Sequence, residues 1–214
     1  MTQKKKKTMR EGYFISFEGG DGSGKSTQIQ ILREFLEERG YDVILTREPG
    51  GTPISEKIRS IILDKANSEM DDMTEALLYA AARAQLVSQI IRPALEEGKV
   101  VICDRFVDSS MAYQAYARGL GDSVKTINAF AVGDCMPDLT ILLKVNPQVG
   151  SSRIGNRERD RIELASSDFH KKVYEGYLQL EKLYPERIVG IDAADTIENI
   201  SGIISERIAG LLER

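Results

Sequence analysis

Short apolar runs alternate with stretches of helical periodicity along most of the chain. Five runs are apolar on both faces and are predicted to be strands: 13–17, 43–45, 100–103, 139–143 and 188–191. Helical patterns lie at 25–39, 55–63, 73–97, 109–118, 122–132 and 197–212, and Pro93 is expected to interrupt or bend the third. Buried strands that alternate with helices are typical of a parallel sheet covered on both sides. We therefore predict a doubly wound α/β fold.

The composition favours one globular domain. The chain has 214 residues, of which 42% are hydrophobic and 29% are charged, and no linker or repeat divides it. Residues 13–214 are therefore predicted to form a single domain. Residues 1–12 include the lysines 4–7, and a disordered basic tail is favoured there over an arm that binds nucleic acid. The net charge of −4 gives no electrostatic reason to expect a nucleic-acid partner.

The sequence also bears on compartment and redox chemistry. No apolar run has the length of a membrane span, and the first residues do not resemble a signal sequence, so we expect a cytoplasmic protein with no membrane partner. Cys103 and Cys135 show neither CxxC nor Cys/His spacing. Because Cys103 ends an apolar run, a buried, inert thiol is expected there.

A glycine-rich segment follows the first predicted strand and opens the first predicted helix. Gly19, Gly24, Lys25 and Ser26 match the pattern G-x-x-x-x-G-K-[ST]. Glycines let backbone N–H groups converge on phosphate oxygens, Lys25 can reach the β and γ phosphates, and Ser26 can bind Mg²⁺. A chance match is the alternative, but the flanking strand and helix favour nucleotide binding. The residues predicted to bind ATP are Gly19, Gly20, Asp21, Gly22, Ser23, Gly24, Lys25, Ser26 and Thr27.

An acid and a base follow the third predicted strand. Asp104 can orient the Mg²⁺ shell, and Arg105 offers a bidentate fork to a second phosphate, because ligands bind at the carboxyl edge of such sheets. A surface ion pair is the alternative. ATP-driven motors often carry consecutive acids here, and a guanine-reading Asn-Lys-x-Asp motif does not occur. These features favour a kinase over a motor or a GTPase.

Cations and one aromatic residue suggest a phosphorylated acceptor. Arg47, Arg59 and Arg105 lie at or after the second and third strands and could neutralise an acceptor phosphate. Tyr79 and Arg83 are four residues apart on a predicted helix, so they share one face and could bind a flat heterocycle. By spacing alone, core packing is the better explanation of Tyr79.

Arginines gather in a polar segment at about 149–164. Arg153, Arg157 and Arg161 recur every four residues, so a helix would place them on one side. A solvated charged face is the alternative. Beside a phosphate-binding loop, a cationic lid is favoured, because arginine can stabilise the transferred phosphoryl group while closure excludes water.

Several segments together resemble bacterial thymidylate kinase (dTMP kinase) from about Tyr13 to the last helix. The matching segments are 17–27 (FEGGDGSGKST), 47–52 (REPGGT), 104–110 (DRFVDSS), 112–114 (AYQ) and 136–140 (MPDLT). The resemblance implies a five-stranded parallel sheet, a homodimer, and Mg²⁺-dependent transfer of the γ-phosphate of ATP to dTMP for dTTP synthesis. The four variable loop positions 20–23 lack arginine, so the chain resembles the branch of the family that carries this arginine in the lid.

The resemblance also assigns roles to individual residues. Asp21 would hold the 3′-hydroxyl of dTMP, and Arg59 and Arg105 would hold its phosphate. Tyr79, usually Phe in this family, would stack on thymine, Arg83 would bond a base carbonyl, and Tyr113 would crowd the 2′ position. The remaining predicted substrate residues are Glu48, Ser110 and Gln114. The predicted catalytic residues are Lys25, Arg105, Arg153 and Arg157, and the predicted metal ligands are Ser26 and Asp104.

Two other functions remain open at this stage. A deoxynucleoside kinase would need a carboxylate base near a 5′-hydroxyl and fewer acceptor arginines, so Arg59 and Arg105 count against it. A nucleotide-responsive switch or assembly ATPase would consume ATP without an acceptor.

Overall fold

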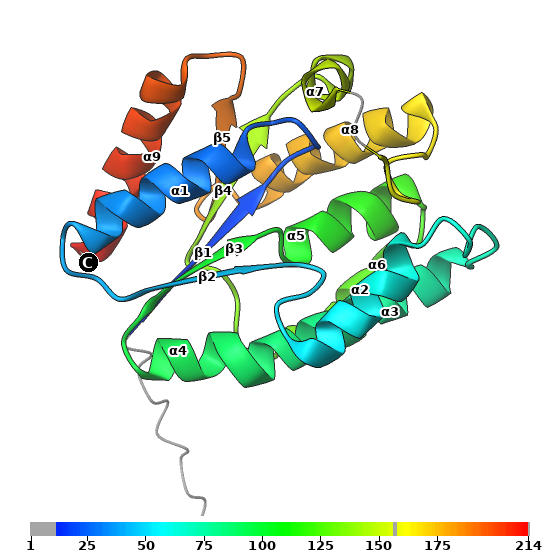
Figure 1. Cartoon of the computed structure of the whole chain (residues 1–214), viewed down its shortest axis with the longest axis horizontal. Coiled ribbons are helices and arrows are strands. Elements are labelled where there is room, and N and C mark those ends of the chain that lie inside the picture. The colour runs from blue at the N-terminus through cyan, green and yellow to red at the C-terminus, as the bar shows by residue number, and fades with distance from the viewer. Residues whose placement is uncertain (1–11, 156–157, 214) are drawn as a thin grey trace, which may run out of the picture.

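The five predicted strands form one parallel sheet in a computed structural model that describes residues 12–155 and 158–213. The strands are β1 (Tyr13–Glu18), β2 (Val43–Arg47), β3 (Val100–Asp104), β4 (Leu139–Lys144) and β5 (Ile188–Asp192). They lie in the order β2-β3-β1-β4-β5, and every neighbouring pair is parallel (Figure 1). The predicted doubly wound, five-stranded fold is confirmed. The segments after β1 and β3 therefore meet at one edge of the sheet.

Helices cover both faces of this sheet (Figure 1). Helices α1 (Lys25–Glu37) and α9 (Ile197–Leu212) pack on one face, where Leu32 and Ile204 share a core with Ile15. On the other face, Leu95 packs against Phe14, because successive strand residues point to opposite sides. The other helices are α2 (Pro53–Leu63), α3 (Asp72–Leu86), α4 (Arg92–Glu96), α5 (Val107–Ser110), α6 (Asp122–Val132), α7 (Pro147–Ile154) and α8 (Ser167–Leu183), with π-helical segments η1 (Val87–Ile91) and η2 (Met111–Ala117).

The long helix predicted at 73–97 is interrupted where expected. The π-helical segment η1 separates α3 from α4, and the Arg92 N–H donates to the carbonyl of Val87, five residues back. Pro93 follows immediately and has no N–H for the carbonyl of Gln89. A wider turn relieves that mismatch, since the hydrogen bonds of a π-bulge skip one more residue than those of an α-helix.

The segment after β4 differs from the sequence prediction in two ways. The expectation of one helical face for Arg153 and Arg161 is wrong, because α7 ends at Ile154 and Gly155 takes a positive φ of 69°. Arg157 lies outside the described residues. The second difference is α8, a helix of 17 residues that the sequence analysis did not predict, capped by the Ser166 hydroxyl, which accepts from the Phe169 N–H.

The predicted tail falls mostly outside the described part of the chain, which begins at Gly12. Gly12 is buried, and its N–H donates to the carbonyl of Leu95 over 2.9 Å. Within the described ranges, no helix is both long and apolar enough to cross a bilayer.

Candidate active site

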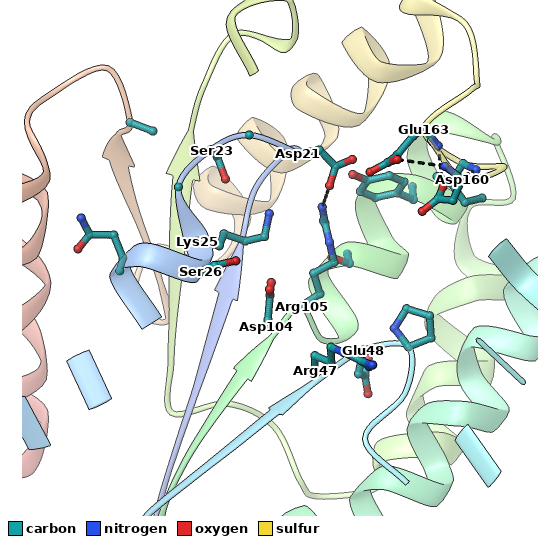
Figure 2. Close-up of a pocket in the computed structure, with 18 of the residues that line it drawn as sticks. Asp21, Ser23, Lys25, Ser26, Arg47, Glu48, Asp104, Arg105, Asp160 and Glu163 are labelled. Carbon is teal, nitrogen blue, oxygen red and sulfur yellow. Dashed lines mark hydrogen bonds and ion pairs between the residues drawn. The ribbon is translucent and has the colours of Figure 1, made fainter. Parts of the chain in front are cut away.

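A cavity of about 710 Å³ opens at the carboxyl edge of the sheet, where the segments after β1, β2 and β3 converge (Figure 2). It brings together most of the residues predicted from the sequence. Those that line it are Asp21, Gly22, Ser23, Gly24, Lys25, Ser26, Thr27, Glu48, Arg59, Tyr79, Arg83, Asp104, Arg105, Ser110, Tyr113, Gln114 and Arg153. Gly19 and Gly20 form the base of the loop and do not line the cavity.

The glycine-rich loop lies directly against α7. Gly22 takes φ of 73°, and a Cβ added there would lie 2.2 Å from the carbonyl oxygen of Gly150. The contact is reciprocal, since a Cβ on Gly150 would lie 2.4 Å from the carbonyl oxygen of Asp21. Backbone thus meets backbone between the loop and the first turns of α7, which no side chain longer than hydrogen would allow.

Lys25 is buried at the start of α1 and turns back onto the loop. Its Nζ donates hydrogen bonds to the carbonyl oxygens of Gly19 and Gly20, each at a distance of 3.0 Å. Burial, followed by the positive charge of Arg105, lowers the pKa of Lys25 to about 8. Anionic phosphate oxygens are better partners for an ammonium group than two neutral carbonyls. The lysine is therefore placed to exchange its contacts when a phosphate enters.

A carboxylate and a hydroxyl face the same space as Lys25. Figure 2 shows Ser26 and Asp104 close to it, on α1 and at the end of β3. Asp104 Oδ1 is buried, and no described residue gives it a hydrogen bond. Residues 12–155 and 158–213 contain no cluster of three or more acidic, His or Cys ligands. Mg²⁺ bound to nucleotide phosphates commonly takes only one or two protein ligands, so these two residues fit that ion.

Arg105 links the loop to the end of β3. Its Nη2 donates to Asp21 Oδ1 at a distance of 2.8 Å, and a dashed line joins these two residues in Figure 2. Its backbone takes φ of 68°, a left-handed conformation that residues with a Cβ adopt rarely, and its N–H donates to the carbonyl of Phe17. This conformation turns the chain sharply as β3 ends and holds the guanidinium in the cavity.

Glu18, the last residue of β1, lies behind Arg105 and was not singled out by the sequence analysis. It is fully buried and accepts hydrogen bonds from the Phe106 N–H, the Ser109 hydroxyl and the Tyr177 hydroxyl, over 2.8, 2.6 and 2.9 Å. Arg105 Nη1 donates to the same two hydroxyls over 3.4 and 3.3 Å. Burial, then the charge of Asp108, raises the pKa of Glu18 to about 7.

Arg83 lies at the opposite wall with its hydrogen-bonding capacity in use. Its donors reach Glu48, the hydroxyl of Ser110, the side-chain oxygen of Asn128 and the carbonyl of Phe106. Four of the five guanidinium N–H groups thus make hydrogen bonds, and Nη2 also forms an ion pair with Glu48. To bond a base carbonyl, as the resemblance implies, Arg83 has to share or exchange one of these partners.

The pair of Arg83 and Glu48 is almost completely buried, with 1% and 3% of the side chains exposed. Burial raises the pKa of Glu48 to about 7, although the charge of Arg83 acts in the opposite direction. Glu48 Oε1 has no hydrogen-bond partner among the described residues. The carboxylate thus keeps one free acceptor in the cavity wall.

The remaining predicted residues occupy different parts of the cavity. Tyr79 is half-buried, and Arg59 donates from Nη1 to the carbonyl of Pro49 over 2.7 Å. Arg153 donates from Nη1 to the carbonyl of Ala193 over 3.0 Å and lies 3.5 Å from that of Gly22. Arg153 therefore lies beside the loop, on the side of the connection between β5 and α9.

Comparison with known proteins identifies the family. A sequence model described as thymidylate kinase matches residues 17–204. The thymidylate kinase of Oceanobacillus iheyensis is 54% identical, over 93% of this chain and 94% of that protein. Those of Geobacillus thermodenitrificans and Lactobacillus helveticus are each 54% identical over 95% of this chain, and the matches cover 91% and 97% of those proteins. The chain belongs to the thymidylate kinase family.

Proposed function

We propose that this protein transfers the γ-phosphate of ATP to dTMP and releases dTDP and ADP, as a step toward dTTP. Family membership supports this activity. The observation that carries it in the structure is a single cavity, in which a phosphate-binding loop faces a wall that bears Arg59, Tyr79 and Gln114. Two nucleotides bound on these opposite walls would bring donor and acceptor phosphates together between Lys25 and Arg105.

On the donor wall, backbone N–H groups of the loop bind the phosphates of ATP, and Lys25 contacts the β and γ phosphates. Ser26 and Asp104 would hold Mg²⁺, which neutralises charge on the phosphate oxygens when bound. The acceptor phosphate is already a nucleophile, so no strong base is needed. Positioning and charge neutralisation then account for most of the rate.

On the acceptor wall, Arg59 and Arg105 bind the phosphate of dTMP and Asp21 binds its 3′-hydroxyl. Tyr79 stacks on thymine, and Tyr113 disfavours a 2′-hydroxyl. The polar group that reads the base edge consists of Glu48, Arg83, Ser110 and Gln114. All of these residues line the cavity, which supports the assignment.

The segment at 149–164 closes over the bound nucleotides and brings Arg153 and Arg157 toward the transferred phosphate. The backbone contact between Gly22 and Gly150 supports a lid that responds to the loop.

We also propose a cytoplasmic homodimer. Phe130 on α6 is 85% exposed, so its ring is available for an interface between two copies of the chain. Light scattering of the intact protein, with and without Phe130→Glu, tests the dimer.

A coupled assay for ADP release with dTMP, dUMP, CMP, AMP and GMP tests the activity. We expect ADP release only with an acceptor, and the highest kcat/KM with dTMP. Equal rates with dTMP and CMP would contradict thymidylate specificity. Equal rates with and without dTMP would favour a nucleotide-responsive ATPase, and faster phosphorylation of thymidine than of dTMP would favour a deoxynucleoside kinase.

A further inference from the structure

Glu75 is a fully buried carboxylate in the acceptor wall, and neither the family resemblance nor the proposed mechanism gives it a role. It lies on α3, one turn before Tyr79 and two turns before Arg83. Its oxygens accept hydrogen bonds from three side chains. The donors are Nε2 of Gln114, Nη2 of Arg118 and Nη2 of Arg161, at distances of 3.0, 3.0 and 2.7 Å. A buried acid with this many partners is firmly held.

These contacts decide which way the side-chain amide of Gln114 points. Glu75 faces two guanidinium groups and therefore offers only acceptor oxygens to Gln114. Gln114 must turn its NH₂ group toward the carboxylate, because its carbonyl oxygen would meet a second acceptor there. Gln114 is 1% exposed and lines the cavity, and no described residue donates to its Oε1. The carbonyl oxygen is left for a ligand.

An acceptor fixed at this position distinguishes the pyrimidine bases. Thymine and uracil carry an N–H at ring position 3, whereas cytosine carries a lone pair there. Gln114 Oε1 can accept a hydrogen bond from the N–H of thymine or uracil, whereas it repels the lone pair of cytosine. A reversed amide, with its NH₂ group toward the base, would favour cytosine instead. We propose that Glu75 is a positioning residue that sets the base preference by holding the Gln114 amide in one orientation. This inference rests on the proposed function, since it assumes that dTMP binds beside Gln114.

The same carboxylate also ties the segment after α7 to the acceptor wall. Arg161 donates from Nε to the carbonyl of Ile62 over 2.8 Å, and its backbone N–H donates to the carbonyl of Leu63. Loss of the Glu75 charge therefore affects Arg161 and Arg118 as well as Gln114. The test must separate orientation of the amide from this general support.

The neighbouring acid Asp72 provides the matched control. Its Oδ1 lies 3.2 Å from Nε of Arg118, so Asp72→Asn removes a carboxylate from the same arginine, whereas the hydrogen bond of Gln114 goes to Glu75. In Glu75→Gln, the new amide can donate or accept, so both orientations of Gln114 become possible. Glu75→Asp keeps the charge but withdraws the carboxylate by one methylene.

The experiment measures kcat and KM for dTMP and dCMP at saturating ATP, with thermal unfolding as a check of folding. We expect Glu75→Gln to lower the ratio of kcat/KM for dTMP over dCMP roughly five- to tenfold, the loss of one oriented hydrogen bond. The loss should appear mainly as a higher KM for dTMP. Asp72→Asn should keep the ratio. If Glu75→Gln does not fold, Glu75→Asp is expected to lower the ratio in the same direction.

A second measurement tests whether Glu75 affects the base preference through the side-chain amide of Gln114. With Gln114→Ala as the background, Glu75→Gln should not change the ratio further, because no amide remains to be oriented. An unchanged ratio in a folded Glu75 variant would overturn the proposal, and so would equal losses for both substrates. The unaltered chain in the same assay tests the proposed function separately, because absence of dTMP phosphorylation there would refute that function and leave no preference to explain.

Discussion

The two walls of the cavity are built in different ways. On the donor wall, Lys25 donates to carbonyls five and six residues away, and the nine loop residues are consecutive. On the acceptor wall, Arg83 bonds to Glu48 and Asn128, which lie 35 and 45 residues away, and Glu75 bonds to Arg161, 86 residues away. The donor wall is thus local backbone geometry, whereas the acceptor wall is a set of buried charge contacts that only the complete fold assembles. Substitutions in the acceptor wall should therefore lower the stability of the fold, whereas substitutions in the donor wall should lower turnover and leave the fold intact.

The sharpest test of this difference is stability. Arg83→Met leaves the Glu48 carboxylate buried without its cation, and removal of one member of a buried pair costs about 3–5 kcal/mol of unfolding free energy. Arg47→Met is the matched control, because Arg47 is the last residue of β2, next to Glu48, but it pairs with Glu56 and the two side chains are 48% and 43% exposed. Its loss should cost about 1 kcal/mol or less. Urea unfolding measures both, and equal costs would contradict the comparison.

On the donor wall, Lys25→Met should affect turnover and leave the fold intact. Removal of one charged donor from a phosphate-transfer site lowers kcat by about 10²–10³. The unfolding free energy should not fall by more than about 1 kcal/mol, since methionine replaces a desolvated charge with an apolar chain. Steady-state kinetics, titration calorimetry with dTMP and urea unfolding together check this. A large loss of dTMP affinity would show that the two walls are not separable.

A smaller effect is expected on the pH dependence of ATP affinity, which should fall as the pH rises above about 8. Phosphate charges should raise the pKa of Lys25 above its value of about 8 in the free protein, so binding takes up a proton above that pH. ATP affinity should be constant below pH 8 and fall by up to about tenfold per pH unit above it. Lys25→Arg, which stays charged, should remove this dependence. Calorimetry at pH 7, 8 and 9 measures it, and an unchanged affinity at pH 9 would contradict it.

The smallest effect is expected at Tyr79. Tyr79→Phe keeps the ring that stacks on the base, so KM for dTMP should change by about twofold or less. Tyr79→Ala removes the ring, and loss of base–aromatic stacking worth about 1–3 kcal/mol should raise KM at least fivefold. A large effect of Tyr79→Phe would instead assign the hydroxyl a direct contact.

The same contrast explains what the sequence could predict. The parallel sheet follows from the apolar runs and is present as predicted, and the glycine-rich motif lies between β1 and α1, as its pattern requires. Glu18 was missed because nothing near it in the sequence signals its partners, Ser109 and Tyr177, which lie 91 and 159 residues away. Tyr177 belongs to α8, the helix that was not predicted.

The arginine-rich segment shows the limit of periodicity. A spacing of four residues indicated a common helical face, but Gly155 ends α7 after Arg153. Arg161 then reaches Glu75 on a different element. Spacing alone does not show where a helix ends, and the destination of a charged side chain depends on contacts that appear only after folding.

The contact between Gly22 and Gly150 has a consequence for how the sequence can vary. Position 22 is one of the four unrestricted positions of the loop motif, yet here α7 leaves no room for any side chain there. Gly150 is under the same restriction from Asp21, although it belongs to no motif. Two sites 128 positions apart in the chain thus share one steric requirement. Substitution at either of them should be tolerated only in relatives in which this helix has moved away from the loop.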